Sequence, residues 1–245
     1  MTDMLWHKSW LETRWRFLIG VALALCSAAA TVLIYPRVLE LVPLVPSNAS
    51  GQIGEQIREA ARLARDYRGY VWSQWFRQNL PQMATLFAIL LGTADVVSQS
   101  RGALFTLSLP VSRARVAGVR VATGLVELFI LVFVSSFAVP ILSPAIGRTY
   151  GAVDTLIHSA CLFVVACLFF ALAFLLSTIF ADPWWPILLA IGVAIVLSAV
   201  SHARVMSAES YFRTGQLPWM GLLTIGAIST TLYYAAVMNI RRRDF

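Results

Sequence analysis

The chain has 245 residues, of which 59% are hydrophobic and only 13% are charged, and its formal net charge is +7. A soluble domain carries roughly twice that share of charged residues, so a chain this apolar could not cover its own surface in water. The positive charge is better matched to a membrane surface than to nucleic acid, and we expect no nucleic-acid partner.

The stretches 17–35, 128–147, 183–201 and 214–240 contain no charged residue. Each is long enough to cross roughly 30 Å of hydrocarbon at about 1.5 Å per helical residue. Lipid offers no partner to backbone N–H and C=O groups, so these stretches must be helical. We therefore predict an all-α integral membrane protein in which residues 1–245 form one domain. Its bundle of about six transmembrane helices covers roughly 17–35, 80–97, 119–142, 156–180, 187–200 and 218–240.

Segments outside the predicted spans also have recognisable patterns. Residues 1–16 form a lead-in in which Trp10, Arg14, Trp15 and Arg16 predict an amphipathic interfacial helix or an ordinary aromatic belt. The first span should end at Pro36. Residues 37–79 form the larger first outer loop, where apolar positions from 53 to 71 recur with helical spacing and predict an amphipathic helix.

Aromatic and glycine positions add two further expectations. We expect Trp72, Trp75 and Phe76 to lie at the depth of the lipid headgroups. Close helix–helix contacts are expected at Gly20, Gly118 and Gly124, although no G-x-x-x-G motif is present.

The sequence lacks the motifs of nucleotide and hydrolase chemistry. Lys8 is the only lysine, and no glycine precedes it, so a Walker A loop is excluded. No H-E-x-x-H or G-x-S-x-G motif is present. Cys26, Cys161 and Cys167 lie in apolar runs without C-x-x-C spacing. We therefore expect no catalytic residue, no bound cofactor and no metal site, and we do not expect an enzyme.

Three polar residues in or beside the spans are candidates for an intramembrane polar site: Glu127, Asp95 and His158. An ionised Glu127 in lipid is costly, so its side chain should face the bundle interior or be protonated. It could contact substrate or a proton, but we favour a structural hydrogen bond to Arg120, to Arg204 or to a Ser/Thr hydroxyl. We expect Asp95 to pair with loop arginines and His158 to make a satisfied polar contact.

The loop at 98–115, between the second and third spans, has apolar residues between basic ends. Leu104, Phe105, Leu107 and Leu109 predict a short apolar helix or turn that stops at Pro110. Ser112 can then cap the third span. Such a helix can dock into a partner's groove or lie in the headgroups, and on these residues alone we favour the headgroups.

This loop resembles a motif of the membrane subunits of type-2 ABC transporters, the exporter-like permeases, in which the second span is followed by a stretch like R-x-G-T-L-x-x-L-L-S-L-P-V-S-R. The matching residues are Arg101, Gly102, Leu104, Leu107, Ser108, Leu109, Pro110, Val111, Ser112 and Arg113. Ala103 stands where Thr is usual, and Gln99 lies near where an acid is common. The lead-in at 10–18 and the ending at 242–245 also resemble that family.

The resemblance implies a fold, partners and a location. A second copy of this permease or a related one would complete the pathway, and a dimer of separately encoded cytosolic ATPases would bind ATP and magnesium. The ATPase-coupling residues would be Arg101, Gly102, Leu104, Phe105, Leu107, Ser108, Leu109, Pro110, Ser112 and Arg113, with the lead-in as a second contact. The protein would be a multi-pass exporter of the bacterial inner membrane with both termini cytoplasmic, an orientation that Arg14, Arg16 and Arg241–Arg243 also favour.

Two alternatives stay open from the residues alone. One is a membrane-embedded enzyme that uses Glu127 with His158 or Asp95. The other is a non-transporting membrane scaffold or immunity protein. The compact outer loops favour a small or amphiphilic cargo, but the sequence does not name it.

Overall fold

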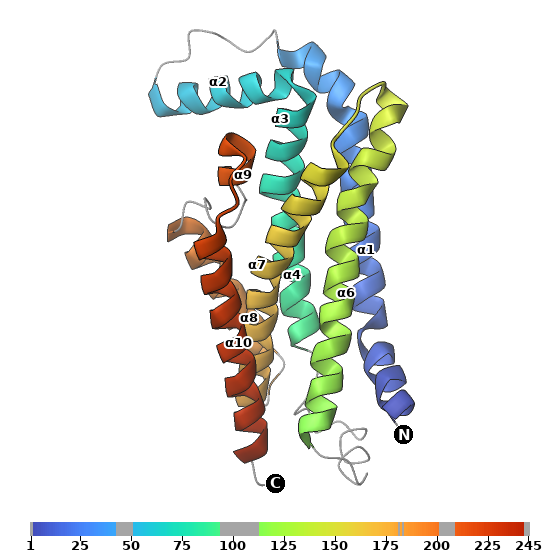
Figure 1. Ribbon diagram of the computed structural model, residues 1–245, viewed down its shortest axis with the longest axis vertical. Coiled ribbons are helices and arrows are strands. Elements are labelled where there is room, and N and C mark those ends of the chain that lie inside the picture. Colours follow the sequence, from blue (N-terminus) through green and yellow to red (C-terminus); the bar gives the residue numbers. More distant parts are fainter. Residues whose placement is uncertain are drawn as a thin grey trace.

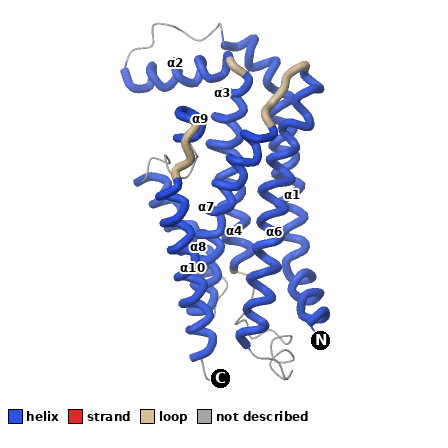
Figure 2. Tube along the Cα trace, viewed as in Figure 1, coloured by secondary structure: helices blue, strands red, loops and turns tan. Residues whose placement is uncertain are grey.

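The chain folds into an elongated bundle of helices (Figure 1). A computed structural model describes residues 2–42, 51–93, 113–180, 182, 184–200 and 209–242. Its elements are α1 (Thr2–Leu41), α2 (Gly51–Arg65), α3 (Tyr67–Val71), the π-helix η2 (Trp72–Asn79), α4 (Leu80–Gly92), α6 (Arg113–Leu142), the 3₁₀-helix η3 (Ser143–Ile146), α7 (Ala152–Ile179), α8 (Trp184–Val200), α9 (Glu209–Thr214) and α10 (Trp219–Arg242). No strand occurs among these residues, which confirms the all-α prediction for the described part of the chain (Figure 2).

Four helical segments are long and apolar enough to cross a membrane: Met4–Leu41, Arg115–Ile146, Ala152–Ile179 and Trp219–Arg242. They identify an integral membrane protein. The predicted second and fifth spans correspond to α4 and α8, which have only 13 and 17 residues. However, α4 continues a helical stretch that begins at Tyr67 and runs through α3 and η2 without a gap.

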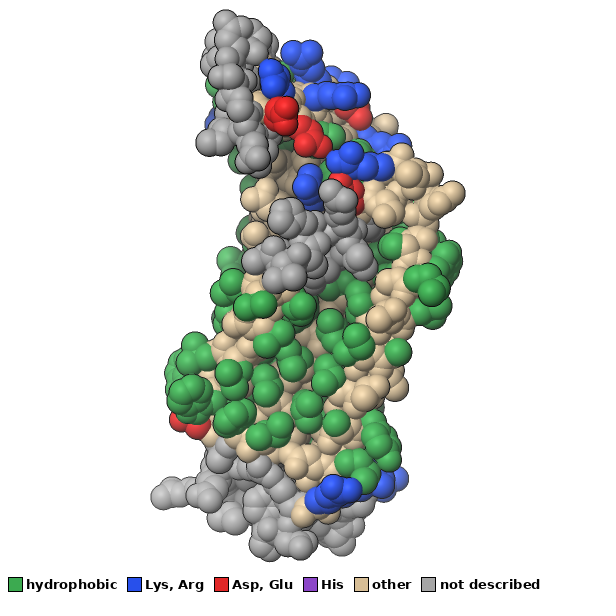
Figure 3. Space-filling model, turned by 90° about the vertical axis from the view of Figure 1, so that its left-hand side faces the viewer, with side chains coloured by type: hydrophobic (Ala, Val, Ile, Leu, Met, Phe, Trp, Pro, Cys, Tyr) green, Lys and Arg blue, Asp and Glu red, His purple; other side chains and the backbone are tan. Residues whose placement is uncertain are grey.

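Apolar side chains form a wide belt over the face of the molecule made by α8 and α10 (Figure 3). Leu188 and Val196 on α8 are 59% exposed, and Leu223 on α10 is 66% exposed. Arginines and acidic residues lie above this belt, at the end of the bundle that carries α2, which we call the distal end. Such a belt is the surface that a lipid bilayer would cover.

The most buried of the four long helices is α7, which packs against α4, α6, α8 and α10. Glycines let its neighbours approach closely. A methyl group on Gly92 of α4 would lie 2.7 Å from the carbonyl oxygen of Phe170, and one on Gly124 of α6 would lie 2.5 Å from the Phe170 ring. Close contact is thus confirmed at Gly124, and at Gly20 beside Phe87, but Gly118 has no heavy atom within 4 Å of the corresponding position.

Gly92→Ala should therefore destabilise the bundle by about 1–3 kcal/mol, because the added methyl group would overlap backbone atoms of α7 that cannot rotate away. Gly118→Ala is the matched control, and should be neutral or stabilising by up to about 1 kcal/mol, since the position is open and helical. Unfolding of both variants in mixed detergent micelles measures the difference. Equal stabilities would contradict the close α4–α7 approach.

The prediction that Pro36 ends the first helix is wrong. The lead-in, the span and the residues beyond Pro36 form one helix of 40 residues, α1. Proline removes one hydrogen bond, but Val38 and Leu39 pack against the core and Val42 is buried, so tertiary contacts carry the helix onward. Residues 2–16 are accordingly helical, as predicted, but they are continuous with the span.

The amphipathic helix predicted in the first outer loop is confirmed as α2, which lies across the distal end of the bundle (Figure 1). Asp66 follows it and caps α3 by accepting a hydrogen bond from the Gly69 amide at 3.3 Å. The next aromatic residues, for which a depth at the lipid headgroups is expected, are covered by protein. Trp72, Trp75 and Phe76 are at most 3% exposed and belong to the hydrophobic core.

Candidate functional site

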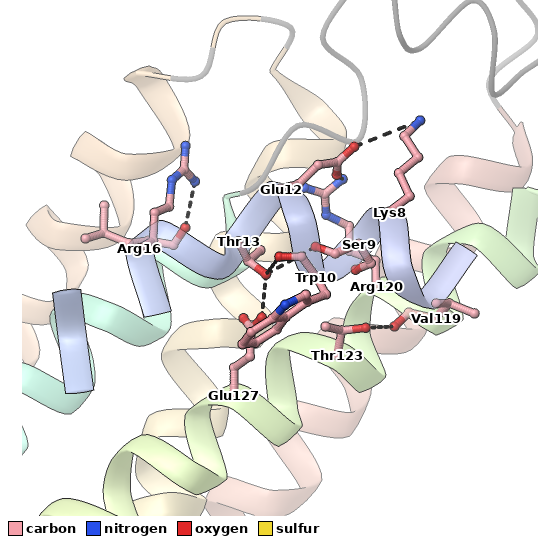
Figure 4. Close-up of polar contacts among 11 residues, drawn as sticks. Lys8, Ser9, Trp10, Glu12, Thr13, Arg16, Val119, Arg120, Thr123 and Glu127 are labelled. Carbon is pink, nitrogen blue, oxygen red and sulfur yellow. Dashed lines mark hydrogen bonds and ion pairs between the residues drawn. The ribbon is translucent and has the colours of Figure 1, made fainter. Parts of the chain in front are cut away.

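A buried carboxylate, Glu127 of α6, is the centre of the candidate site. The residue is 2% exposed, which confirms that it faces the interior. The Thr13 hydroxyl of α1 donates a hydrogen bond to its Oε1 (Figure 4). Its second oxygen, Oε2, has no hydrogen-bond partner among the described residues. Of the partners expected for a structural hydrogen bond, the structure shows a threonine hydroxyl, and on one oxygen only.

Thr13 reaches Glu127 because α1 and α6 pack against each other along their lengths and run in the same direction (Figure 1). The Thr13 hydroxyl also lies 3.2 Å from the Ser9 carbonyl oxygen, the usual backbone acceptor four residues earlier in a helix. The Trp10 carbonyl oxygen lies 3.5 Å away, so one hydroxyl faces three acceptors and the carboxylate receives only a shared hydrogen bond.

Arg120, the expected ionic partner, pairs elsewhere. Its Nη1 lies 3.4 Å from Oε2 of Glu12, and Lys8 Nζ lies 3.9 Å from the other oxygen of Glu12. No ion pair to Glu127 occurs within the described part of the chain, and Arg204 lies outside it. The Arg120 guanidinium, two turns away, thus pairs with Glu12, and its charge also acts on Glu127.

A groove of about 400 Å³ lies along α1 and α6 beside the carboxylate. Its lining residues are Trp6, His7, Trp10, Thr123, Val126, Glu127 and Ile130. Trp6 is 41% exposed and Val126 is 54% exposed, so the groove is open at the outer surface of the helix pair. We call this surface the α1–α6 groove.

Two of the predicted lead-in residues help to hold this region. Trp10 lines the groove and packs edge-on against Phe17, with ring centroids 5.5 Å apart. Arg16 donates to the Leu90 carbonyl oxygen at 3.0 Å and so links α1 to α4. Arg14 lies over the ring of Trp15, which is 65% exposed.

Several predicted site residues cannot be positioned in this site. Asp95 and the coupling residues from Arg101 to Ser112 lie outside the described residues. Arg113 is the first residue of α6.

His158 of α7 lies in a different part of the bundle. It is 3% exposed and is stacked on Phe76 at 5.0 Å, with the Tyr211 ring edge-on at 5.4 Å. The expected satisfied polar contact is not found, because neither ring nitrogen has a hydrogen-bond partner among the described residues. Glu127 and His158 share no partner, so the structure does not join them in one site.

The surroundings of His158 form a polar cluster at the distal end. Asp154 accepts a hydrogen bond from the Tyr211 hydroxyl at 3.1 Å and pairs with Arg68 Nε at 3.1 Å. Burial, followed by the nearby Asp154 charge, raises the pKa of Tyr150, and burial with the Asp154 hydrogen bond raises the pKa of Tyr211. Both hydroxyls therefore stay protonated, and Tyr211 remains a donor.

The short helix α9 fastens this cluster to the outer helices. Its Phe212 stacks on Trp72 at 4.2 Å, and its Arg213 pairs with Glu59 of α2 at 3.2 Å. Together with the Tyr211 hydrogen bond, these contacts join α2, η2 and α7. The cluster has internal partners for its charges and so functions as a structural junction.

Comparison with protein-family models, with curated proteins and with solved structures finds no match to this chain. Thr13, Glu12 and Trp6 complete the site around Glu127, and the sequence analysis did not single them out. Helical spacing could have pointed to Trp6 and Thr13, because residues 6, 9, 10 and 13 lie on one face of the lead-in helix. What the site offers is a buried carboxyl group beside apolar and aromatic surface.

Proposed function

We propose that this chain is the transmembrane subunit of an ABC transporter, which carries a substrate across the membrane with energy from a separate ATPase. Two such subunits, identical or related, would form the pathway, and export from the bacterial cytoplasm is the expected direction. The observation that carries the proposal is the loop sequence from Arg101 to Arg113, with its apolar centre, its Pro110 stop and its basic ends.

The arrangement of the helices supports this assignment. Both ends of the described chain, Thr2 and Arg242, lie at the same end of the bundle as the last turn of α4 and the first turn of α6 (Figure 1). The described residues on either side of 94–112 thus lie at the end that carries Arg14, Arg16, Arg241 and Arg242. A cytosolic position of this end agrees with the preference of positive residues for the cytoplasmic side.

Six crossings would follow if α4, with the helical turns before it, and α8 each span the bilayer. A short helix can cross where the bilayer thins or where neighbours cover its ends. The loop would then transmit motion: ATP-driven closure of the ATPase dimer would press on it and favour one of two arrangements of the helices.

Purification from native membranes tests the proposal. The tagged full-length chain should bring down an ATPase with a Walker A motif, and the complex should hydrolyse Mg-ATP. Replacing the Walker lysine of that ATPase should abolish hydrolysis without releasing the partner. A chain that never associates with such an ATPase, in membranes where both are expressed, would contradict the proposal.

A further inference from the structure

We infer that the α1–α6 groove binds a lipid-soluble organic cation, with Glu127 as its counter-charge. The site combines three features: a carboxylate oxygen without a partner, two tryptophans and a groove of about 400 Å³ that opens at the surface of the helix pair. Each of them favours the same class of ligand.

The carboxylate selects for positive charge. An ionised group that is 2% exposed has lost almost all its water, and the loss is offset only by a cation or by hydrogen bonds. Thr13 supplies one shared hydrogen bond, and Oε2 receives none from the described residues. An ammonium or phosphonium group in the groove would complete the pairing.

The walls select for an apolar body. Trp6, Trp10, Val126 and Ile130 provide most of the lining, and small-molecule sites are typically apolar cavities of roughly 300–1,000 Å³ with a few polar groups. Trp6 and Trp10 also offer aromatic faces, which attract cations. A hydrophilic cation would lose its hydration here without enough polar contacts in return.

The other charges nearby leave the position beside Glu127 open to a ligand. Arg120 and Lys8 are both directed to Glu12, and His7 is exposed at the edge of the groove. Because Val126 and Ile130 are exposed on the outer surface of α6, a ligand dissolved in the bilayer can reach the groove sideways. Figure 4 shows Thr13 of α1 in contact with Glu127 and the ring of Trp10 next to it.

The inference concerns binding and needs no ATPase. If the proposed function also holds, the groove indicates the class of the transported substrate, which is a lipid-soluble cation taken from the membrane. Failure to bind would leave the ATPase partnership standing, and failure to find an ATPase would leave the binding site standing.

Two probes of the same size and opposite charge test the inference: tetraphenylphosphonium and tetraphenylborate. The full-length chain is reconstituted into nanodiscs of phosphatidylcholine, and binding is measured by equilibrium dialysis with empty nanodiscs subtracted. We expect tetraphenylphosphonium to bind at least tenfold more tightly than tetraphenylborate. Equal binding of the two probes, or no saturable binding of the cation, overturns the inference without any variant being needed.

Variants then test whether Glu127 supplies the negative charge that binds the cation. Glu127→Gln keeps the shape and removes the charge, so it should weaken tetraphenylphosphonium binding at least tenfold. Glu59→Gln makes the same change on the exposed surface of α2 and should leave the affinity unchanged. Trp10→Leu should weaken binding by roughly 2- to 30-fold, because the cation–π attraction is lost while the wall stays apolar. Unaltered affinity in a folded Glu127→Gln protein overturns the inference.

Lipid composition separates two sources of the natural cation. If an amine headgroup of the membrane occupies the groove, adding phosphatidylethanolamine to the nanodiscs lowers the apparent affinity for tetraphenylphosphonium in proportion to its share. If a free organic cation is the natural ligand, the affinity does not change. Both results support a cation site and differ in its source.

Discussion

Phe105→Asp should abolish ATP-driven transport and lower the yield of co-purified ATPase at least tenfold. Phe105 stands at the centre of the apolar part of the loop, between Arg101 and Arg113. If this part sits in a groove of the ATPase, a carboxylate would be desolvated there without a partner, and loss of a central apolar contact typically costs about 2 kcal/mol or more. Substrate-stimulated ATP hydrolysis and uptake into inside-out vesicles measure the effect.

The controls for this variant separate docking from folding. Phe105→Leu keeps the apolar side chain and should retain most activity. Arg58→Glu makes a charge change on the exposed face of α2, at the opposite end of the bundle, and should leave ATPase binding unaltered. Full coupling in the Phe105→Asp protein would favour the other interpretation of the loop, in which its apolar residues lie in the headgroups.

Hydrophobic length decided what could be predicted about the fold. Long apolar runs located α1, α6, α7 and α10 because crossing a bilayer requires about 20 apolar residues. The helix α2 was predictable from the helical spacing of its apolar residues alone. One of its faces must be apolar whether it lies on the membrane or on other helices. The prediction failed at Pro36, where a local signal was outweighed by the packing of Val38 and Leu39.

The candidate site was predictable only in part. The cost of a charge in lipid identifies Glu127 as a residue that faces the interior, and the structure agrees. Its partner depends on how α1 is aligned along α6, and helices separated by more than 100 residues carry no sequence signal of that alignment. Arg120, two turns before Glu127 on the same helix, seemed the natural partner, but Glu12 of α1 engages it instead.

The positions of the aromatic residues after α3 were also not predictable from the sequence, for a different reason. Tryptophan near the end of a span is typical both of the headgroup region and of a protein core, because its ring is apolar and its N–H is polar. Sequence spacing does not separate the two. Trp75 is fully buried, and its Nε1 has no hydrogen-bond partner among the described residues, so apolar packing decided its position.

Trp75→Ala should accordingly destabilise the protein by about 3–5 kcal/mol, the cost of emptying a large aromatic site in a packed core. Trp75 lies in η2, a π-helix of eight residues, which is a rare conformation. The π-helix directs both Trp72 and Trp75 into the core. Without the Trp75 ring, the segment can return to α-helical geometry, which would rotate α4 and disturb the close approach of Gly92 to Phe170.

Trp219→Ala is the matched control, because Trp219 is 63% exposed at the start of α10 and should cost no more than about 0.5 kcal/mol. Unfolding in mixed micelles gives the two free energies, and hydrogen exchange across 80–92 reports the rotation of α4. Were Trp75 an interfacial anchor, as its sequence position indicates, both variants would change stability by similar small amounts. A cost below about 1 kcal/mol for Trp75→Ala would therefore place that ring in the headgroups and remove the reason for the π-helix.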